Sequence, residues 1–138
     1  MYMQIFLPVR HKGKSYKILI ADDDELVRDI LVEVLKKKEN YLVDEAINGI
    51  EACIKLGIYK PDLLILDILM PEMDGLEATK LIRSEDISVL NNEIPIIAMT
   101  AHAMKEDMEQ CLAVGMNGYI SKPVSQKCIA EAIEKIFV

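Results

Sequence analysis

The feature that most constrains the fold of this chain is a regular alternation that begins at Lys17, in which short apolar runs are followed by longer segments of helical periodicity. This alternation is typical of strand-helix units repeated around a parallel sheet. The runs at 17–21, 63–66 and 94–99 are continuously apolar, as inner strands covered on both faces should be. The sequence therefore predicts an α/β fold with five strands, at 17–21, 41–46, 63–66, 94–99 and 118–121.

Between the strands, apolar residues recur at the three- and four-residue spacing of helices. Gly115 stands where it would end the fourth helix, and Ser125 where it would cap the fifth. We expect most methionines, including Met104 and Met108, to fill the core. The expected helices are 26–35, 50–58, 76–83, 104–112 and 125–137.

Length and composition limit the number of domains and the classes of function that this chain can have. A chain of 138 residues fits one domain. A net charge of −7 argues against direct binding to nucleic acid, which needs basic residues along the phosphate backbone. The sequence has no apolar run of the roughly 18 to 20 residues that span a bilayer, so we expect no membrane contact. The three cysteines, Cys53, Cys111 and Cys128, lack a CxxC pair, which favours reduced thiols in the cytoplasm.

Four of the expected strands end in charged or hydroxyl residues, in the segments ILIADDD, LLILD, IIAMT and GYISK. In a parallel sheet these endings share one edge, and ligand sites of open α/β sheets lie outside that edge. Five side chains should therefore converge there: Asp22, Asp23, Asp67, Thr100 and Lys122.

Three carboxylates in one crevice repel one another, and Lys122 offsets only one of the three charges. A divalent cation would restore neutrality, and Mg2+ fits best because it prefers oxygen ligands and is commonly held by carboxylates together with phosphate oxygens. With a metal present, a carboxylate can attack phosphorus and form an acyl phosphate. Lys122 and the Thr100 hydroxyl would then stabilise the transferred group.

The ordered set of motifs closely resembles the receiver domains of response regulators in two-component signalling. The resemblance covers 17–138, and it rests on Asp22-Asp23 with Arg28 five residues later, DILMPEMDG from Asp67 to Gly75, Thr100-Ala101, and GYISKP from Gly118 to Pro123. It implies a flavodoxin-like (βα)5 doubly wound sheet of strand order 2-1-3-4-5, with two helices on one face and three on the other. Residues 1–16 are then a linker or the end of a preceding domain.

The resemblance also implies a role for each site residue. Asp67 matches the phosphorylated aspartate, and Asp23 a direct ligand of Mg2+, which Mn2+ can replace. Asp22 matches an acid that contacts the metal mostly through water, and Leu69 the position whose backbone carbonyl completes the coordination.

Thr100 and Lys122 match the hydroxyl and the cation that hold the phosphoryl group, and Tyr119 matches an aromatic switch that works with Thr100. By the same resemblance, the Lys122–Pro123 bond is expected to be cis, Ala101 keeps the site accessible, and positions 69 and 102 tune dephosphorylation. We assign no catalytic role to Asp24, which is expected to cap a helix, nor to Asp74 and Gly75, which suit a turn and a helix start.

Two alternative functions are disfavoured because the residues that they require are absent from the matching positions. Phosphatases with an aspartyl nucleophile, of the haloacid-dehalogenase type, carry a second Asp two residues after the nucleophile, where this chain has Leu69. A flavodoxin-like cofactor binder would carry a phosphate loop rich in Ser, Thr and Gly, where this chain has acidic residues at 22–24.

Two hypotheses about the parent protein remain open. IFLPV at 5–9 resembles the last strand of histidine-kinase ATP-binding domains, which favours the C-terminal receiver of a hybrid sensor histidine kinase over a stand-alone response regulator. The isolated domain would then catalyse only its own phosphorylation and dephosphorylation. Its expected partners are a histidine kinase or its own kinase core, and a histidine phosphotransfer domain.

Overall fold

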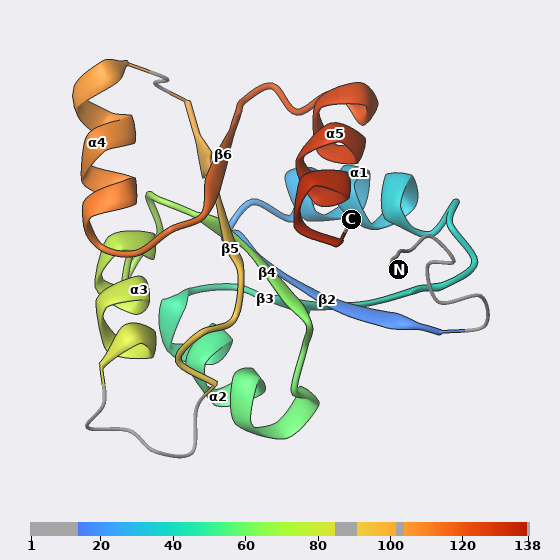
Figure 1. Cartoon of the computed structure of the whole chain (residues 1–138), viewed down its shortest axis with the longest axis horizontal. Coiled ribbons are helices and arrows are strands. Elements are labelled where there is room, and N and C mark those ends of the chain that lie inside the picture. Colours follow the sequence, from blue (N-terminus) through green and yellow to red (C-terminus); the bar gives the residue numbers. More distant parts are fainter. Residues whose placement is uncertain (1–13, 85–90, 102–103, 138) are drawn as a thin grey trace, which may run out of the picture.

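The computed structural model describes residues 14–84, 91–101 and 104–137, in which strands and helices alternate along the chain (Figure 1). The strands are β2 (Tyr16–Ala21), β3 (Tyr41–Ala46), β4 (Leu63–Asp67), β5 (Ile96–Thr100) and β6 (Gly118–Ser121). The helices are α1 (Glu25–Leu35), α2 (Gly49–Tyr59), α3 (Gly75–Arg83), α4 (Lys105–Ala113) and α5 (Gln126–Phe137).

The five strands form one parallel sheet in the order β3-β2-β4-β5-β6. Counted along the described chain, this is the order 2-1-3-4-5, so the flavodoxin-like fold predicted from the sequence is confirmed. Because all strands run in the same direction, the carboxyl ends of β2, β4, β5 and β6 lie at one edge of the sheet.

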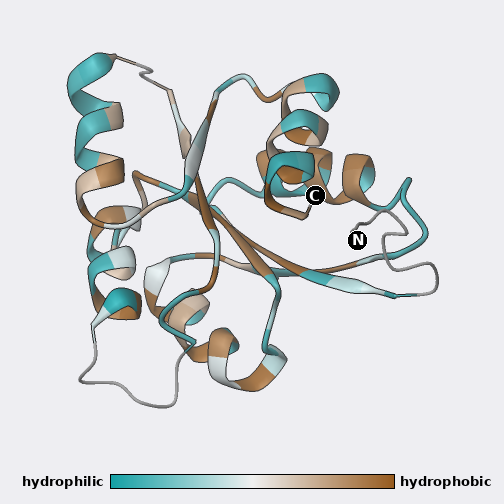
Figure 2. Ribbon diagram, viewed as in Figure 1, coloured by the Kyte–Doolittle hydropathy of each residue, from teal (hydrophilic) through white to brown (hydrophobic). Residues whose placement is uncertain are grey.

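Successive residues of each inner strand point to opposite faces, and each face is covered by its own helices. Ile18 and Ile20 of β2 pack with buried residues of α1 and α5, including Leu31 and Ile129. Leu19 and Ala21 of the same strand belong to a second cluster that includes residues of α2, α3 and α4. Two helices therefore cover one face and three the other, as expected, and the hydrophobic segments of the ribbon run through the centre of Figure 2.

The expected boundaries hold to within two residues, and the largest shift has a simple cause. The fourth strand was expected to begin at Ile94 but begins at Ile96. Pro95 lies between them and has no N–H to donate to a neighbouring strand. Its carbonyl oxygen still accepts a hydrogen bond from the Leu64 N–H at 3.0 Å.

Capping side chains fix the start of several helices. Asp24 accepts a hydrogen bond from the Leu26 N–H, and Asp74 accepts one from the Glu77 N–H, so both acids cap helices as expected. Ser125 accepts one from the Cys128 N–H at the start of α5. Gly115 follows the end of α4 with a positive φ of 106°, the conformation that glycine tolerates best.

Two apolar patterns face solvent rather than the core. In α2 the buried residues are Gly49, Ala52 and Leu56, whereas the isoleucines that indicated this helix point outward. In α4 only Cys111 is buried, and Met104 and Leu112 are exposed, so the expectation that Met104 fills the core is wrong. Met104 occupies the N-cap position before the first turn of α4, and in α2 the small Gly49 and Ala52 allow the helix to lie close to the sheet.

Residues 1–13, which include the IFLPV segment, and His102 lie outside the described part of the chain. Within the described ranges, no helix has the length and apolar character needed to cross a membrane.

Candidate functional site

The end of β4 and the loop after β2 bring three carboxylates together. Asp67 is the last residue of β4, and Asp22 and Asp23 directly follow β2, which is its neighbour in the sheet. One carboxylate oxygen of each residue lies within 4.8 Å of the other two. Asp22 and Asp67 are buried, whereas Asp23 is exposed to solvent. The convergence predicted from the sequence is therefore present for all three acids.

Lys122, which follows β6, reaches this cluster from the other side. Its Nζ atom lies 2.9 Å from Asp22 Oδ2 and 3.2 Å from Asp67 Oδ2. The Lys122 N–H donates to the Thr100 carbonyl oxygen at 2.8 Å, which fixes the loop after β6 beside the end of β5. The Lys122–Pro123 peptide bond is cis, as expected.

Burial and neighbouring charges both alter the pKa values of Asp67 and Lys122. Burial, followed by repulsion from Asp22, raises the pKa of Asp67 from 3.8 to about 6, against the opposing attraction of Lys122. Burial alone would lower the pKa of Lys122, but its hydrogen bond to Asp22 and the attraction of both carboxylates outweigh burial and raise it. Lys122 is therefore held as a cation, and Asp67 carries its negative charge at an energetic cost.

The start of α3 closes tightly over the backbone of Asp67. The Gly75 N–H donates to the Ile68 carbonyl oxygen at 2.8 Å, and a Cβ atom at Gly75 would overlap the Asp67 carbonyl oxygen. The sequence predicted a helix start at Gly75 but not this contact. The only signal was the Asp-Gly pair itself, because the contact depends on how α3 packs against the sheet.

Arg28 of α1 forms a hydrogen bond that holds the backbone of the acidic loop at 22–24 in place. Its Nη1 atom donates to the Asp22 carbonyl oxygen at 2.8 Å, and its Nε atom lies 3.1 Å from Glu45 Oε1. Asp22 Oδ1 accepts the Asp24 N–H at 2.9 Å. Arg28 was part of the sequence motif, but its positioning contact could not be predicted before the packing of α1 against β2 was known.

The remaining predicted residues lie on β5 and β6 or in the loops that follow β4 and β5. Thr100 ends β5 and is buried, and Ala101 beside it is exposed. The Leu69 side chain is largely exposed in the loop after β4. Tyr119 on β6 keeps 44% of its surface exposed, so its ring faces outward.

The donor chemistry of the site suits Mg2+ or Mn2+. All three clustered side chains offer oxygen atoms, which these hard cations prefer. Asp22 Oδ2 is buried and accepts no hydrogen bond of standard geometry from the described residues, although the Lys122 ammonium group lies beside it. A buried anionic oxygen in that position is suited to a further cationic partner.

Comparison with known families agrees with this geometry. Residues 18–134 match the model of the response regulator receiver domain. The chain belongs to the response regulator receiver family. A receiver domain takes part in two-component phosphorelay signalling, so the family and the site chemistry point in the same direction.

Relatives of this receiver domain include both short and long proteins. It is 37% identical to the chemotaxis protein CheY of Halobacterium salinarum, over 87% of this chain and 95% of that protein. It is 34% identical to Histidine kinase 5 of Arabidopsis thaliana, over 86% of this chain but only 15% of the plant protein. The chain therefore spans nearly all of one relative and a small part of the other.

Solved structures include receiver domains of both origins. The chemotaxis response regulator CheY4 of Vibrio cholerae superimposes with a TM-score of 0.80 at 28% identity, covering 89% of this chain and 99% of that chain. The receiver domain of a sensor histidine kinase from Pseudomonas aeruginosa superimposes with a TM-score of 0.76 at 29% identity, covering 89% and 98%. The latter structure holds a magnesium ion coordinated in its active-site cleft.

Proposed function

We propose that this receiver domain accepts a phosphoryl group on Asp67 from a phosphohistidine of a histidine kinase. The observation that carries the proposal is the position of the Asp67 carboxylate, 3.2 Å from the Lys122 ammonium group and clustered with Asp22 and Asp23. The other two acids follow the end of β2, whereas Asp67 ends β4, the central strand of the sheet.

In the proposed step, a carboxylate oxygen of Asp67 attacks phosphorus as the phosphorus–nitrogen bond of the phosphohistidine breaks. The bonding electron pair goes to the imidazole nitrogen, and an acyl phosphate forms. Lys122 and the Thr100 hydroxyl compensate the charge of the phosphoryl oxygens. A Mg2+ ion held by Asp22, Asp23, Asp67 and the Leu69 carbonyl would, when bound, neutralise the phosphoryl oxygens during transfer.

The acceptor assignment is tested by labelling with a phosphorylated histidine kinase or a small phosphodonor. Asp67→Asn should lose all labelling because an amide cannot form the acyl phosphate, whereas the cap variant Asp24→Asn should keep it. Mass spectrometry should place the phosphate on Asp67. A phosphate mapped to Asp22 or Asp23 would overturn the assignment.

The metal assignment is tested by titrating Mg2+ or Mn2+ into variants. Asp23→Ala should weaken metal binding more than Asp24→Ala, since only Asp23 belongs to the cluster. Excess EDTA should stop phosphorylation. Undiminished phosphorylation in EDTA would contradict a metal-dependent step.

We also propose that the phosphorylated state is relayed through Thr100 and Tyr119. A phosphoryl group on Asp67 would draw the Thr100 hydroxyl towards it and leave space into which the exposed Tyr119 ring can turn. The surface made by α4, β6 and α5 would then change, and this is the surface that an output partner would read.

For the parent protein we propose the C-terminal receiver of a hybrid sensor histidine kinase, in the cytoplasm, with its own kinase core or a histidine phosphotransfer domain as partner. The kinase-like segment IFLPV and the relationship to Histidine kinase 5 support this placement. The near-complete coverage of the halobacterial CheY favours a stand-alone regulator as the second candidate. The genomic reading frame upstream of Met1 distinguishes them: a kinase core continuing in frame supports the first, and a stop codon directly upstream supports the second.

A further inference from the structure

The outward face of α2 carries an uninterrupted row of isoleucines. Ile50, Ile54 and Ile58 have exposed fractions of 42%, 56% and 77%, and Ile47, which lies just before the N-cap of the helix, is 50% exposed. The four-residue spacing of Ile50, Ile54 and Ile58 places these three on one side of the helix, opposite the buried Ala52 and Leu56. Much of the α2 ribbon is brown in Figure 2, whereas the upper turns of α4 are largely teal.

The surroundings of this row leave it open to a close contact. Gly57 lies beside the row, and a Cβ atom there would meet nothing within 4 Å, so another backbone could approach. The Glu51 carboxylate accepts the Ile47 N–H at 3.0 Å and is thereby turned back towards the start of the helix. Single exposed apolar residues are ordinary on a protein surface, but a contiguous row of large ones marks an interaction site.

The row is self-complementary. Ile50, Ile54 and Ile58 are four residues apart and form one ridge of the kind that packs into the grooves of another helix. If two copies of α2 meet antiparallel with a two-fold axis at Ile54, Ile50 of each copy lies against Ile58 of the other. Glu51 then lies at the level of Gly57 of the other copy, and at 1.5 Å per residue the two Glu51 residues are about 9 Å apart along the helix axis, so these like charges do not oppose each other.

The ends of α2 are also complementary in charge. At the start of the helix the Glu72 carboxylate accepts a hydrogen bond from the Asn48 side chain at 3.3 Å, and at its end Lys60 is exposed. An antiparallel pair brings the acidic end of each helix to the basic end of the other, and it aligns the helix dipoles favourably. Each copy carries a net charge of −7, so an uncharged contact surface also keeps repulsion low.

We propose that the outer face of α2 forms a homodimer in which two α2 helices pack antiparallel about Ile54. This inference goes beyond the proposed phosphoryl transfer, because it uses no residue of the Asp67 site. One helical face is smaller than the roughly 800 Å2 that each partner buries in a standard interface, so the dimer is a weak one.

Sedimentation velocity across roughly micromolar to millimolar protein, the range suited to small interfaces, tests the contact. The wild type should dimerise, and Ile54→Lys should raise the dimer Kd at least about tenfold because two ammonium groups would meet at the axis. Leu112→Lys is the matched control, since Leu112 is 57% exposed but lies on α4. A monomeric wild type, or dissociation by Leu112→Lys and not by Ile54→Lys, would overturn the proposal.

The antiparallel register has its own test. Ile50→Lys and Ile58→Glu should each weaken self-association, but an equimolar mixture of the two variants should form a heterodimer, because the new lysine of one lies against the new glutamate of the other. Added salt should strengthen the wild-type dimer by screening the net charge and weaken the heterodimer. Failure of the mixture to associate would rule out this register.

Discussion

At the scale of single residues, the Asp67 carboxylate is the most consequential group, because the fold holds it in an unfavourable state. Its pKa of about 6 lies above the value of 3.8 for an ordinary aspartate, through burial and repulsion from Asp22. The folded chain therefore binds this proton more tightly than the unfolded chain does. The resulting stability is fully present below pH 3.8 and is lost as the pH rises through about 6.

Asp67→Asn should consequently stabilise the metal-free protein near neutral pH. Removing the buried charge should raise the free energy of unfolding at about pH 8 by on the order of 2 kcal/mol, and the gain should shrink as the pH falls below about 6. Urea denaturation in EDTA, at about pH 8 and again below pH 6, measures this gain in the free energy of unfolding. Asp29→Asn, on the exposed side of α1, controls for removal of a surface charge. A gain that is equal at both pH values would contradict the assigned cause.

The site acids and Lys122 could be predicted because parallel strands force their carboxyl ends to one edge, so sequence position fixes proximity. The support from Arg28 and the contact of Gly75 with Asp67 could not. Both contacts depend on the distance between a helix and the sheet, and the sequence pattern alone does not give that distance.

At the scale of elements, two helical glycines have opposite surroundings. A side chain at Gly75 would overlap the Asp67 carbonyl oxygen, whereas one at Gly57 would meet open space. Gly75→Ala should therefore cost about 1 to 3 kcal/mol through overpacking and slow phosphorylation by displacing Asp67. Gly57→Ala should stabilise α2 by up to about 1 kcal/mol, since alanine favours helices. Thermal unfolding of both variants checks this pair, and an equal loss in both would contradict it.

Arg83 at the end of α3 ties together the elements at the edge opposite the site. Its guanidinium group donates to the carbonyl oxygens of Gly115 and Asn92 and to Asn117 Oδ1, each at 2.9 Å. Asn117 Oδ1 also accepts the Ile96 N–H at 2.8 Å, so the group spans the starts of β5 and β6.

Arg83→Lys should loosen this edge, because an ammonium group cannot reach three acceptors in the planar arrangement of a guanidinium group. We expect a loss of about 1 to 3 kcal/mol in stability and faster amide exchange at Ile96 and Asn117. Lys80→Arg on the same helix is the control. Unchanged exchange at both amides would show that the three hydrogen bonds carry little stability.

The existence of every helix could be predicted from periodicity, but the buried face of α2 could not. Gly49, Ala52 and Leu56 have the same spacing as the outward isoleucines, and they are less hydrophobic as a set. The packing of α2 against the sheet decides which of the two sets is buried. In α4, likewise, periodicity alone does not separate the buried Cys111 from the exposed Leu112 beside it.

At the scale of the whole molecule, the proposed relay from Asp67 to the α4-β6-α5 surface is a shift between two populations. A hydrogen bond from Thr100 to a charged phosphoryl oxygen contributes about 1.5 to 3 kcal/mol, which is a bias of roughly tenfold to a hundredfold. Thr100→Ala should therefore remain phosphorylatable but signal poorly.

Amide chemical shifts of 104–127, with and without a beryllofluoride phosphoryl mimic, measure the relay. The wild type should change across this segment, and Thr100→Ala should change only near Asp67. Thr79→Ala, which removes a hydroxyl bonded to the Gly75 carbonyl oxygen instead, is a comparison variant of the same chemistry. Equal changes in wild type and Thr100→Ala would show that the relay does not pass through Thr100.

The strand order and the division of helices between the two faces followed from the sequence pattern together with the family resemblance, because both are shared by the whole fold. Local packing decides which individual side chains are buried and which are exposed. The features that are particular to this chain, such as the exposed isoleucines of α2, arise at this level.

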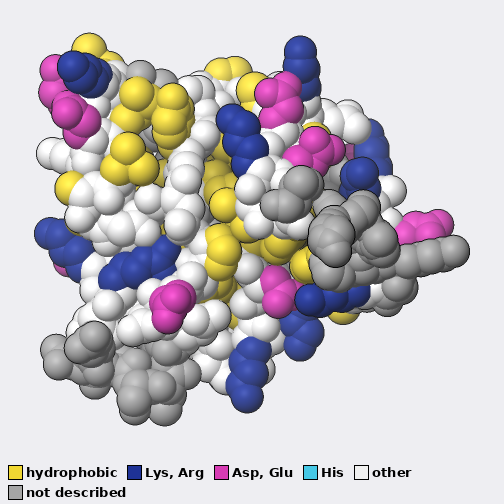
Figure 3. Space-filling view, viewed as in Figure 1, with side chains coloured by type: hydrophobic (Ala, Val, Ile, Leu, Met, Phe, Trp, Pro, Cys, Tyr) yellow, Lys and Arg dark blue, Asp and Glu magenta, His cyan; other side chains and the backbone are white. Residues whose placement is uncertain are grey.

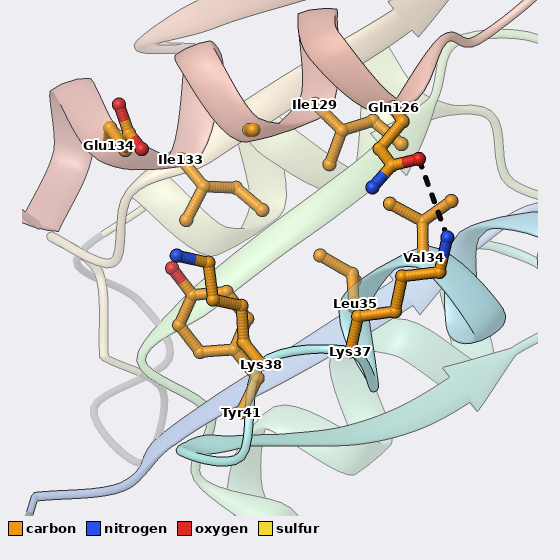
Figure 4. A pocket seen from close by; sticks show the side chains of 10 residues that line it. Val34, Leu35, Lys37, Lys38, Tyr41, Gln126, Ile129, Ile133 and Glu134 are labelled. Atoms are coloured by element: carbon orange, nitrogen blue, oxygen red, sulfur yellow. Dashed lines mark hydrogen bonds between the residues drawn. The ribbon is translucent and has the colours of Figure 1, made fainter.

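The two ends of the described fold meet in an aromatic contact. The Tyr16 ring at the start of β2 stacks on Phe137 at the end of α5 with 4.1 Å between ring centroids, and Tyr41 packs edge-on beside them. The same corner borders a small groove lined by residues of α1 and α5, including Leu35 and Ile133 (Figure 4). On the face of the molecule drawn in Figure 3, basic side chains in dark blue and acidic side chains in magenta are scattered rather than gathered in one patch.

Because Tyr16 and Phe137 lie at opposite ends of the domain in sequence but side by side in space, any polypeptide joined at either end departs from one corner. The strands run from that side towards Asp67, so a tether of either kind leaves the acidic pocket facing away from its anchor. A partner can therefore reach the Asp67 carboxylate from the side of the sheet opposite to both chain ends.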